Sequence, residues 1–362
     1  MRNIGPIGPD LRPILAAGRG RGGRYRDMRK INVVSVVWNN RDALPRFLDS
    51  VVHQVVPGFE VEVVVVDNGS DDGSIEYLRS RSDILFIDSG VNAGFPAGMN
   101  RGVEASDGEY VVMCTDDLIF RPGTLAALAD ALDRDETLGG VAPLIETSPE
   151  GDHLYPVATR HPGVAYGWSF FSGLQSKFPN SKWAAVGLER DFDDFDRDLP
   201  WLHGCCGMYR RRALDSVGGG FDECFFMYFE DADLGRRLTE AEWRLRRIPE
   251  ARIFHAEIHP NRQQRSPTRR FFVESWHRYV ARYESWPVRQ VAHVAVFFGL
   301  LLQVGAQALR RLLRRSHSYG VFSQYLRTHL RSWFGGIDYD RRAEIEAHKK
   351  AWNPIPKIEQ AV

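Results

Sequence analysis

Three acidic side chains lie within four positions of one another, directly after a run of aromatic residues. The acids are Glu230, Asp231 and Asp233, and the run from Phe225 to Phe229 has the composition of a strand. A carboxylate beside apolar residues is costly to bury unless it is paired or used, so this cluster predicts a carboxyl group with a shifted pKa. The alternative is an ordinary helix start, where Glu230 and Asp231 complement the helix dipole and Asp233 faces water.

Polar residues also follow each of four predicted strands earlier in the chain. These strands are apolar, largely β-branched runs at 31–38, 61–66, 84–87 and 110–113. Helical patterns between them predict an α/β fold with a mostly parallel sheet flanked by helices. Because right-handed crossovers bring the carboxyl ends of such strands to one edge, we expect Asp67, Asn92 and Asp116 to line one crevice. Taken singly, each could be an ordinary turn residue.

The later part of the domain is less regular. Further strands are predicted at 141–144, 201–209, 243–248 and 251–255, with a helix from Asp233 to about Ala241. Between Ser148 and Pro200, aromatic residues lie among glycine, proline and serine, and six acids follow between Glu189 and Asp198. A long irregular segment of this kind is typical of a functional loop or lid, or of a partly ordered insertion.

The composition excludes several classes of protein. The 362 residues are 43% hydrophobic and 26% charged with a formal net charge of zero, which favours a folded chain and argues against a nucleic-acid partner. Four cysteines without a C-x-x-C pair indicate reduced thiols in a cytoplasmic protein. Residues 1–30 hold eight basic and two acidic residues and no apolar core, which predicts a disordered basic arm and no signal peptide. Met28 is an alternative start of translation.

The C-terminal third has a different character. No acid occurs from Ser285 to Ile337, whereas arginine recurs. The apolar run from Val291 to Leu302 is shorter than the ~20 residues needed to cross a bilayer. A basic, amphipathic helical segment of this kind suits the surface of an anionic membrane. The alternative is a helix that docks on the catalytic domain with a basic outer face.

Four motifs, in their order and spacing, resemble those of family 2 glycosyltransferases of the GT-A fold, especially bacterial rhamnosyltransferase-like members. They are the opening strand at 33–40, the loop at 65–74, the Asn-Ala-Gly-Phe-Pro-Ala-Gly-Met-Asn-Arg-Gly sequence at 92–102 and the block at 220–234. The resemblance, which runs from about residue 31 to 260, implies a Rossmann-like GT-A domain at 31–262. The change in composition beyond it predicts a helical extension at 263–362, for which membrane association is one interpretation.

The resemblance also implies roles for individual residues. Asp231 is expected to be the catalytic base and Asp116 to hold Mg²⁺ or Mn²⁺, with His255 and Asp117 as weaker candidate ligands. The residues expected to bind the donor are Asn39, Asp67, Asn68, Ser70, Asn92, Gly94, Asn100 and Asp116. Those expected on the acceptor side are Trp201, Gly204 and Glu230. One departure is Cys114, which stands where the family's metal motif usually has an acid or asparagine.

A single base at Asp231 suggests an inverting transfer of a sugar from a nucleoside-diphosphate donor, and the resemblance alone favours rhamnose as the sugar. The expected acceptor is a hydroxyl of a lipid-linked saccharide at the inner face of the cell membrane, used in the synthesis of an envelope polysaccharide, and such an acceptor would explain the basic C-terminal segment. A nucleotidyltransferase is one alternative, although Trp38-Asn39-Asn40 replaces the glycine-rich phosphate loop such an enzyme usually has. The other is a non-catalytic, membrane-associated protein that binds sugar nucleotides.

Overall fold

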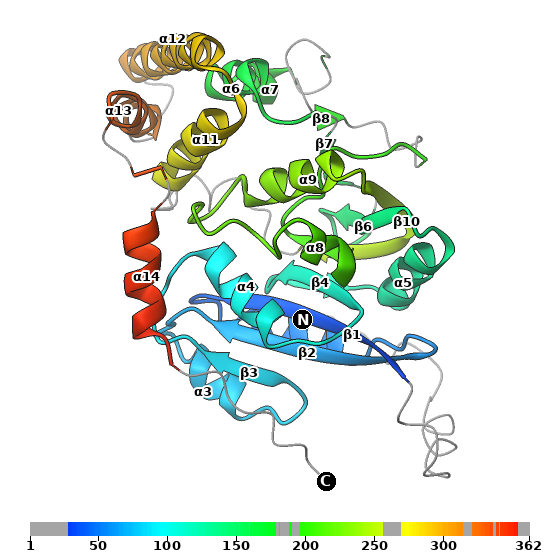
Figure 1. Cartoon of the computed structure of the whole chain (residues 1–362). Coiled ribbons are helices and arrows are strands. Elements are labelled where there is room, and N and C mark those ends of the chain that lie inside the picture. The colour runs from blue at the N-terminus through cyan, green and yellow to red at the C-terminus, as the bar shows by residue number, and fades with distance from the viewer. Residues whose placement is uncertain are drawn as a thin grey trace, which may run out of the picture.

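An eight-stranded mixed sheet forms the centre of the molecule (Figure 1). The computed structural model describes residues 28–151, 153–158, 160–178, 181, 188–189, 196–255, 269–313, 321–335, 338–339 and 341–353. In order across the sheet, the strands are β3 (Leu85–Asp88), β2 (Phe59–Asp67), β1 (Arg29–Val37), β4 (Tyr110–Thr115), β9 (Cys206–Arg210), β6 (Leu138–Glu146), β10 (Arg244–His255) and β5 (Leu118–Phe120).

The first half of the sheet is parallel, as the sequence predicts. β3, β2, β1 and β4 run parallel, so their carboxyl ends meet at one edge. β9 is antiparallel to both β4 and β6, and β5 is antiparallel to β10, while β6 and β10 run parallel. A small separate sheet pairs β7 (Val157–Ala158) with β8 (Leu188–Glu189). The α/β class is confirmed, with a sheet that is more mixed than expected.

Both faces of the sheet are buried because successive strand residues point to opposite sides. Val33 and Val65 belong to the core shared with α2 (Leu44–Val52), α3 (Ser74–Arg79) and α5 (Thr124–Arg134). Val34 and Val66 belong to the core on the other face, under α4 (Phe95–Glu104), α8 (Arg211–Ser216) and α9 (Glu230–Glu240). Unbroken valine runs therefore fit strands that are covered on both faces.

A third core joins the C-terminal helices to the sheet domain. It is built around α11 (Arg269–Tyr283) and α12 (Trp286–Leu312), with α6 (Val164–Phe171) and the 224–232 segment packed against them. The remaining helices are α7 (Leu174–Lys177), α13 (Val321–Trp333) and α14 (Arg342–Ala351). In Figure 1, α11, α12 and α13 lie together beyond α9, whereas α14 runs back along the sheet domain beside α4.

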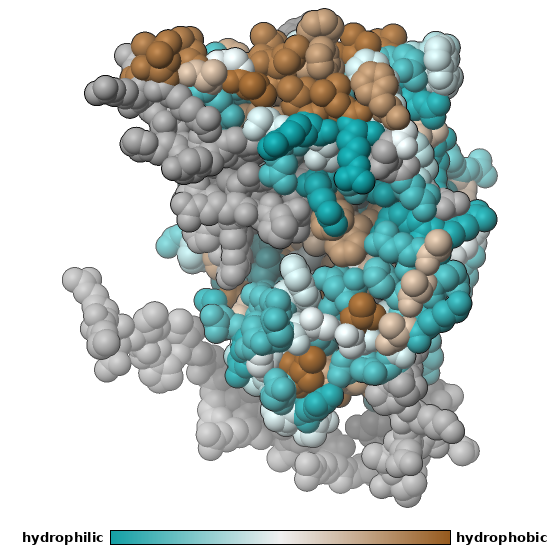
Figure 2. Space-filling model, turned by 90° about the vertical axis from the view of Figure 1, so that its left-hand side faces the viewer, coloured by the Kyte–Doolittle hydropathy of each residue, from teal (hydrophilic) through white to brown (hydrophobic). Residues whose placement is uncertain are grey.

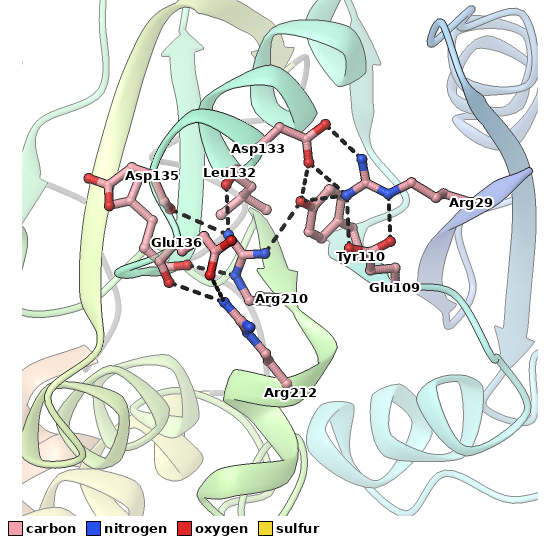
Figure 3. Close-up of polar contacts among 10 residues, drawn as sticks. Arg29, Glu109, Tyr110, Leu132, Asp133, Asp135, Glu136, Arg210 and Arg212 are labelled. Atoms are coloured by element: carbon pink, nitrogen blue, oxygen red, sulfur yellow. Dashed lines mark hydrogen bonds and ion pairs between the residues drawn. The ribbon is translucent and has the colours of Figure 1, made fainter.

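Ion pairs and hydrogen bonds join the strands and α5 at the edge of the sheet opposite to Asp67 and Asp116 (Figure 3). Arg29, at the start of β1, pairs with Glu109 at 2.6 Å and with Asp133 of α5 at 2.6 Å. The Tyr110 hydroxyl donates to Asp133 at 2.5 Å, and Arg210 donates to the Leu132 carbonyl at 2.6 Å. These contacts join β1, β4, β9 and α5 at the amino ends of β1 and β4, which leaves the carboxyl ends open for chemistry.

Several predicted boundaries were wrong. The predicted strand at 201–209 is a loop as far as Cys205, with β9 beginning at Cys206. The two strands predicted at 243–248 and 251–255 are one irregular strand, β10, with a register shift between Ile248 and Arg252. β5 was not predicted, because it has only three residues. The predicted basic arm lies outside the described residues as far as Asp27, and β1 begins at Arg29.

The aromatic run before the acidic cluster was also predicted wrongly. Residues 226–229 form bends instead of a strand, and both Tyr228 and Phe229 have left-handed backbone conformations, with φ of 71° and 68°. Bulky residues adopt this conformation only where their surroundings hold them in it. Here Phe229 is buried in the third core, and the Met227 carbonyl accepts a 2.8 Å hydrogen bond from Ser275 of α11.

Candidate functional site

Two adjacent carboxyl groups, Asp116 and Asp117, follow β4 at the open edge of the sheet. Asp117 accepts hydrogen bonds from the Thr115 hydroxyl at 2.7 Å and contacts the His255 ring through Nε2 at 2.8 Å. His255 comes from the end of β10, where the antiparallel register with β5 sets it opposite Leu118. Burial alone would raise the pKa of Asp117, but the contact with His255 lowers it below its usual value. Asp117 is therefore an ionised carboxylate at neutral pH.

Asp116 lacks the neutralising partner that Asp117 has. It is 9% exposed, and its Oδ2 atom has no hydrogen-bond partner among the described residues. Burial, and next the charge of Asp117, raise the pKa of Asp116 to about 8. A buried carboxyl group without a cation near it is expected to hold a proton, and a bound cation would replace that proton. The two aspartates and His255 thus offer oxygen and nitrogen ligand atoms of the kind that bind a divalent cation.

His203 belongs to the same site and was not predicted. Burial, and next the charge of His255, lower its pKa to about 4, so the ring is neutral. Its Nδ1 accepts a 3.2 Å hydrogen bond from the Cys205 amide, and the ring lies edge-on to Tyr155 at 4.8 Å between centroids. His203 adjoins Gly204, which was predicted to lie on the acceptor side. It was missed because the 201–209 segment was predicted to be a strand, whereas residues 201–205 form a loop at the site.

Asp231 lies at the first turn of α9 and faces the loop before β9. Its Oδ2 accepts a 2.8 Å hydrogen bond from the Gly204 amide, and its Oδ1 accepts one of 2.8 Å from the Ala232 amide. Burial raises the pKa of Asp231 to about 6 in spite of these bonds. A Cβ atom on residue 204 would lie 3.1 Å from the carboxylate, so glycine allows the loop to approach this closely.

The loop at 203–205 connects Asp231 with the acidic pair. Gly204 holds the Asp231 carboxylate, and the next residue, Cys205, accepts a 2.9 Å hydrogen bond from the Thr115 amide through its carbonyl. Thr115 immediately precedes Asp116, and this bond continues the antiparallel pairing of β4 with β9, which runs from Tyr110 to Cys114 along β4. The structure therefore brings together two groups of acids that lie more than a hundred residues apart in the chain.

The other two acids of the cluster have different surroundings. Glu230 is 5% exposed, its Oε2 has no partner among the described residues, and burial raises its pKa well above the usual value. Because the Asp231 charge adds to this rise, Glu230 holds the proton and Asp231 carries the charge. A buried, protonated Glu230 is poorly placed for the predicted contact with an acceptor. Its main interaction is with the neighbouring Asp231, whose charge helps to keep Glu230 protonated.

Asp233 does not face water, as the helix-start interpretation would require. It is fully buried and binds Arg237 at 2.9 Å, Arg282 of α11 at 2.7 Å and the Tyr283 hydroxyl at 2.7 Å. Arg237 in turn donates to the carbonyls of Val217 and Gly220. Asp233 therefore fixes the start of α9 to α11 and to the segment that leads into the acidic cluster.

Replacing Asp233 with asparagine should lower the free energy of unfolding by about 3 kcal/mol or more, because removing one member of a buried ionic network leaves the others unpaired. Urea denaturation measures this change. The matched control is Asp130→Asn on α5, which breaks an exposed ion pair with Arg134 and should cost less than about 1 kcal/mol. Equal effects of the two substitutions would show that Asp233 does not hold α9 in place.

The loop after β2 supplies the predicted donor-binding residues Asp67, Ser70 and Asn39. Asp67 is fully buried; its Oδ1 accepts a 2.8 Å hydrogen bond from the Ser70 amide, and its Oδ2 has no partner among the described residues. Asn39 follows β1 in a left-handed conformation, with φ of 53°, and bonds to Ser70 and to the Asp71 amide. The charge of Asp67 contributes to the raised pKa of Asp116, so this loop lies close to Asp116 and Asp117.

The other predicted donor-binding residues hold loops together. The Asn68 amide donates to the Gly94 carbonyl at 2.9 Å, and Asn92 accepts from the Gly94 amide at 3.0 Å. Asn100 bonds through both ends of its amide to the backbone of Phe221, with a further bond to Glu223. Because these contacts use the Asn100 side chain, we leave it out of the proposed donor site.

Gly94 is needed where two of the motifs touch. It has a φ of 103°, and a Cβ atom there would lie 2.7 Å from the Phe226 carbonyl oxygen, which accepts a hydrogen bond from the Phe95 amide at 2.9 Å. The 92–102 motif thus packs directly on the bends that precede Asp231. Trp201 packs on α9 over Gly235, one turn after Asp231, and its indole donates to the Arg160 carbonyl at 3.3 Å.

Cys114, the departure in the metal motif, is not available as a ligand. It is fully buried in the core that contains Cys205 and Cys206, and burial raises the pKa of its thiol well above the usual value. Only a thiolate binds metal well. The ligands at this end of β4 must therefore come from Asp116, Asp117 and the histidines that face them.

Comparisons with known proteins agree with this arrangement. The sequence profile described as "Glycosyl transferase family 2" matches residues 32–218. A Mycobacterium tuberculosis protein named N-acetylglucosaminyl-diphospho-decaprenol L-rhamnosyltransferase is 33% identical over 239 residues, which cover 63% of this chain and 76% of the relative. Rhamnosyltransferase WbbL of Escherichia coli is 43% identical over 178 residues, which cover 49% of this chain and 63% of the relative.

Two solved structures share the fold. A Pyrobaculum calidifontis mannosyltransferase, in complex with GDP-mannose and Mn²⁺, aligns with a TM-score of 0.50 and 16% identity over 90% of this chain and 86% of that one. GalNAc-T7 with UDP, GalNAc and Mn²⁺ aligns with a TM-score of 0.54 and 14% identity over 91% and 59% of the two chains. Together with the family match, these likenesses confirm the GT-A fold and decide against a nucleotidyltransferase. The chain belongs to glycosyl transferase family 2 and is a glycosyltransferase.

Proposed function

We propose that the protein is an inverting glycosyltransferase that moves a sugar, with rhamnose favoured, from a nucleoside-diphosphate donor to a hydroxyl of a lipid-linked saccharide in the synthesis of an envelope polysaccharide. The observation that carries the proposal is the 203–205 loop, which binds Asp231 on one side and the end of β4 on the other. The mycobacterial relative's name, with its diphospho-decaprenol acceptor and rhamnosyl group, supports the choice of both substrates.

The acidic pair suits the diphosphate side of the reaction. We assign Asp116, Asp117 and His255 to hold Mg²⁺ or Mn²⁺, since Asp116 has a buried oxygen without a partner and Asp117 is already oriented by His255. A divalent cation, when bound, neutralises the charge that develops on the departing nucleoside diphosphate. The neutral ring of His203 lies close enough to His255 and Asp117 for their charges to shift its pKa, so it borders this set. Asp67 and Asn39 are assigned to the nucleoside.

Asp231 suits the acceptor side. Because Glu230 keeps its proton, Asp231 is the carboxylate that accepts the proton of the attacking hydroxyl. The amides of Gly204 and Ala232 orient it, and the left-handed residues before α9 fix the direction in which the helix starts. A single base facing the sugar from the side opposite to the leaving group gives one displacement, with inversion at the anomeric carbon.

A donor and product screen tests the proposal. Thermal-shift measurements with different nucleoside diphosphates and Mn²⁺ should identify one preferred nucleotide, because a ligand that binds only the folded state raises its melting temperature. Mass spectrometry of lipid-extract products made with the matching sugar nucleotide should then show the mass of one added deoxyhexose. A product without added sugar, across all donors that bind, would overturn the proposed activity.

The rate of transfer should depend on pH through Asp231. A general base must be ionised, and burial raises the pKa of Asp231 to about 6, so kcat should fall as pH decreases through 6, by about tenfold per unit below it. Stopped assays at saturating Mn²⁺ and donor, from pH 4.5 to 8, measure this limb. A rate that stays constant from pH 8 down to about 5, as expected for a base with the ordinary aspartate pKa of about 4, would show that the base does not have the raised pKa of Asp231.

We further propose that the enzyme is peripheral on the inner face of the cell membrane. One side of α12 is packed on the third core through Ala292, Val296 and Leu300. The other side exposes apolar residues along its length, namely Trp286, Val291, Val294, Phe298, Leu301, Leu302 and Leu309. Figure 2 shows apolar side chains gathered at the end of the molecule where α12 lies. Such a surface, with Arg289, Arg327 and Arg331 nearby, suits an anionic bilayer.

The length of this helix was underestimated from the sequence. α12 has 27 residues, and the stretch Trp286–Arg310 is long and apolar enough to cross a membrane by length and composition. Its packing against α6, α11 and α13 favours a helix that lies in the membrane surface. Deleting residues from 285 onward would also remove part of the third core, so substitutions on the exposed face are the better test.

Replacing Val291, Phe298 and Leu302 together with glutamate should move the protein from the membrane to the soluble fraction, because it removes apolar area and adds three charges that anionic lipids repel. These side chains are 60%, 54% and 61% exposed, so folding should be retained. The control is Val55→Glu, which changes a similarly exposed apolar residue at the far end of the chain. Flotation on liposomes with anionic lipid measures the effect; unchanged flotation would refute the surface assignment.

A further inference from the structure

Three histidines from three different helices meet in the interior of the C-terminal helical region. His277 of α11, His293 of α12 and His329 of α13 are each no more than 2% exposed. Each ring offers a nitrogen, and these three nitrogens lie within 4.8 Å of one another. His277 Nε2 and His329 Nδ1 are 3.0 Å apart, close to the spacing of about 3.3 Å between two nitrogens bound to one tetrahedral Zn²⁺.

The protonation of the rings suits metal binding. The other nitrogen of His329, Nε2, lies 3.0 Å from the backbone carbonyl of His293, to which it donates. This bond leaves the lone pair of Nδ1 pointing to the cluster, as a backbone carbonyl does for many metal-bound histidines. Burial lowers the pKa of His293 and of His329 to about 4, and that of His277 well below its usual value. All three imidazoles are therefore neutral, which is the form that binds metal.

The cluster has unsatisfied polar atoms and adjoining space. Nδ1 of His277 and Nδ1 of His293 are buried without a partner among the described residues, although buried polar atoms are generally bonded. A cavity of about 310 Å³ lies against His293, lined also by Gln290, Trp333 and Tyr339. The rings of His277 and His293 are close to parallel, at 19°, so binding one ion requires the His293 ring, which borders the cavity, to turn about its side-chain bonds.

We propose that His277, His293 and His329 form a buried Zn²⁺ site that cross-links α11, α12 and α13, with a fourth position open to the cavity. Three neutral imidazoles favour a borderline-soft ion such as Zn²⁺ over Mg²⁺ or Mn²⁺, which prefer oxygen ligands. The site is distinct from Asp116, Asp117 and His255, which come from the sheet. Its role is structural, because it joins the helices that hold the apolar face of α12.

Metal analysis of the full-length protein tests the site. After purification without chelator, incubation with ZnSO₄ and desalting, elemental analysis should find about one tightly held zinc per chain. Co²⁺ added to the metal-free protein should give the visible absorption of a four-coordinate cobalt site. A hundredfold excess of Zn²⁺ over its Kd should raise the melting temperature by about 5 °C.

Matched variants separate the two metal sites. His329→Gln should lose the bound zinc and the cobalt absorption while keeping Mn²⁺-dependent donor binding. His255→Gln should show the reverse, and His53→Gln, at an exposed histidine after α2, should change neither. Because a substitution at a buried histidine can prevent folding, the zinc content and the cobalt absorption of the wild-type protein decide whether the site exists. Wild-type protein that takes up no zinc and shows no cobalt absorption would overturn the proposal and leave three hydrogen-bonded histidines without an ion.

Discussion

Replacing Asp231 with asparagine should lower kcat by about 10²–10⁴-fold and leave donor binding nearly unchanged. Asparagine keeps the shape of the side chain and can still accept the hydrogen bond from the Gly204 amide, but it cannot take a proton from the attacking hydroxyl. We assign donor binding to the loop after β2 and the acids after β4, whereas the hydrogen bonds of Asp231 in the described residues go to the amides of Gly204 and Ala232. The measurement is a steady-state assay with the preferred sugar nucleotide, together with nucleotide affinity by calorimetry.

Two controls make this result specific. Glu230→Gln imitates the protonated form that burial gives Glu230, so it should lose far less activity, about tenfold or less, although it adjoins Asp231. Asp130→Asn, on the exposed side of α5, should have no effect on rate. If Asp231→Asn retains near-normal turnover, or if Glu230→Gln is the more damaging change, the proton acceptor is a different group.

Removing the divalent cation should have an effect of similar size. Treatment with EDTA is expected to lower turnover by about 10³-fold or more, since several kcal/mol of charge stabilisation in the transition state depend on the ion. Mn²⁺ alone should then restore the wild-type enzyme, which separates this site from the zinc proposed among the helices. Asp116→Asn and His255→Gln should bind Mn²⁺ more weakly and need higher concentrations for the same rate.

The outcome that would contradict this assignment is simple to recognise. An enzyme that keeps its full rate in EDTA, with no manganese detected after desalting, would mean that protein side chains alone stabilise the leaving diphosphate. In that case Asp116 would be a buried, protonated acid, as its raised pKa suggests for the metal-free protein. His53→Gln serves as the control for the histidine variant, because it changes an exposed ring far from the site.

Much of the site could be predicted from the sequence, because parallel strands place their carboxyl ends at one edge. The apolar runs identified β1, β2 and β4, and Asp67 at the end of β2 does lie near Asp116, which follows β4. What the pattern could not predict was pairing between distant segments. β9 inserts antiparallel beside β4, and only this pairing brings Gly204, and with it Asp231, to the acidic pair.

The failures also have physical causes. Composition favoured a strand at 225–229, but packing against α11 bends the backbone there into left-handed conformations. The three acids of the cluster look alike in sequence, yet Asp233 is an ion-pair anchor, Glu230 a buried acid and Asp231 a partly exposed carboxylate. His203 was missed because a histidine in an apolar segment is a weak signal until its neighbours are known.

The C-terminal region was predicted as a separate extension, and the structure shows why this division remains a proposal. Phe229, beside the acidic cluster, shares a core with α11 and α12. α14 returns to the sheet domain, where Lys349 pairs with Glu223 at 3.1 Å. Just after α14, the Trp352 ring lies under the Arg101 guanidinium, whose central carbon is 4.8 Å from the ring centroid. The proposed boundary at residue 262 lies outside the described residues. The helices proposed to contact the membrane therefore also support the bends that precede Asp231.

The most direct test of the central claim, that one cleft holds the diphosphate and the base on opposite sides of the sugar, is the stereochemistry of the product. Proton NMR of the saccharide formed from a sugar nucleotide of known anomeric configuration, with wild-type enzyme and Mn²⁺, reads that configuration directly. We predict the opposite configuration in the product, and loss of its formation with Asp231→Asn. A product that retains the donor's configuration would contradict the arrangement of Asp231 opposite the leaving group.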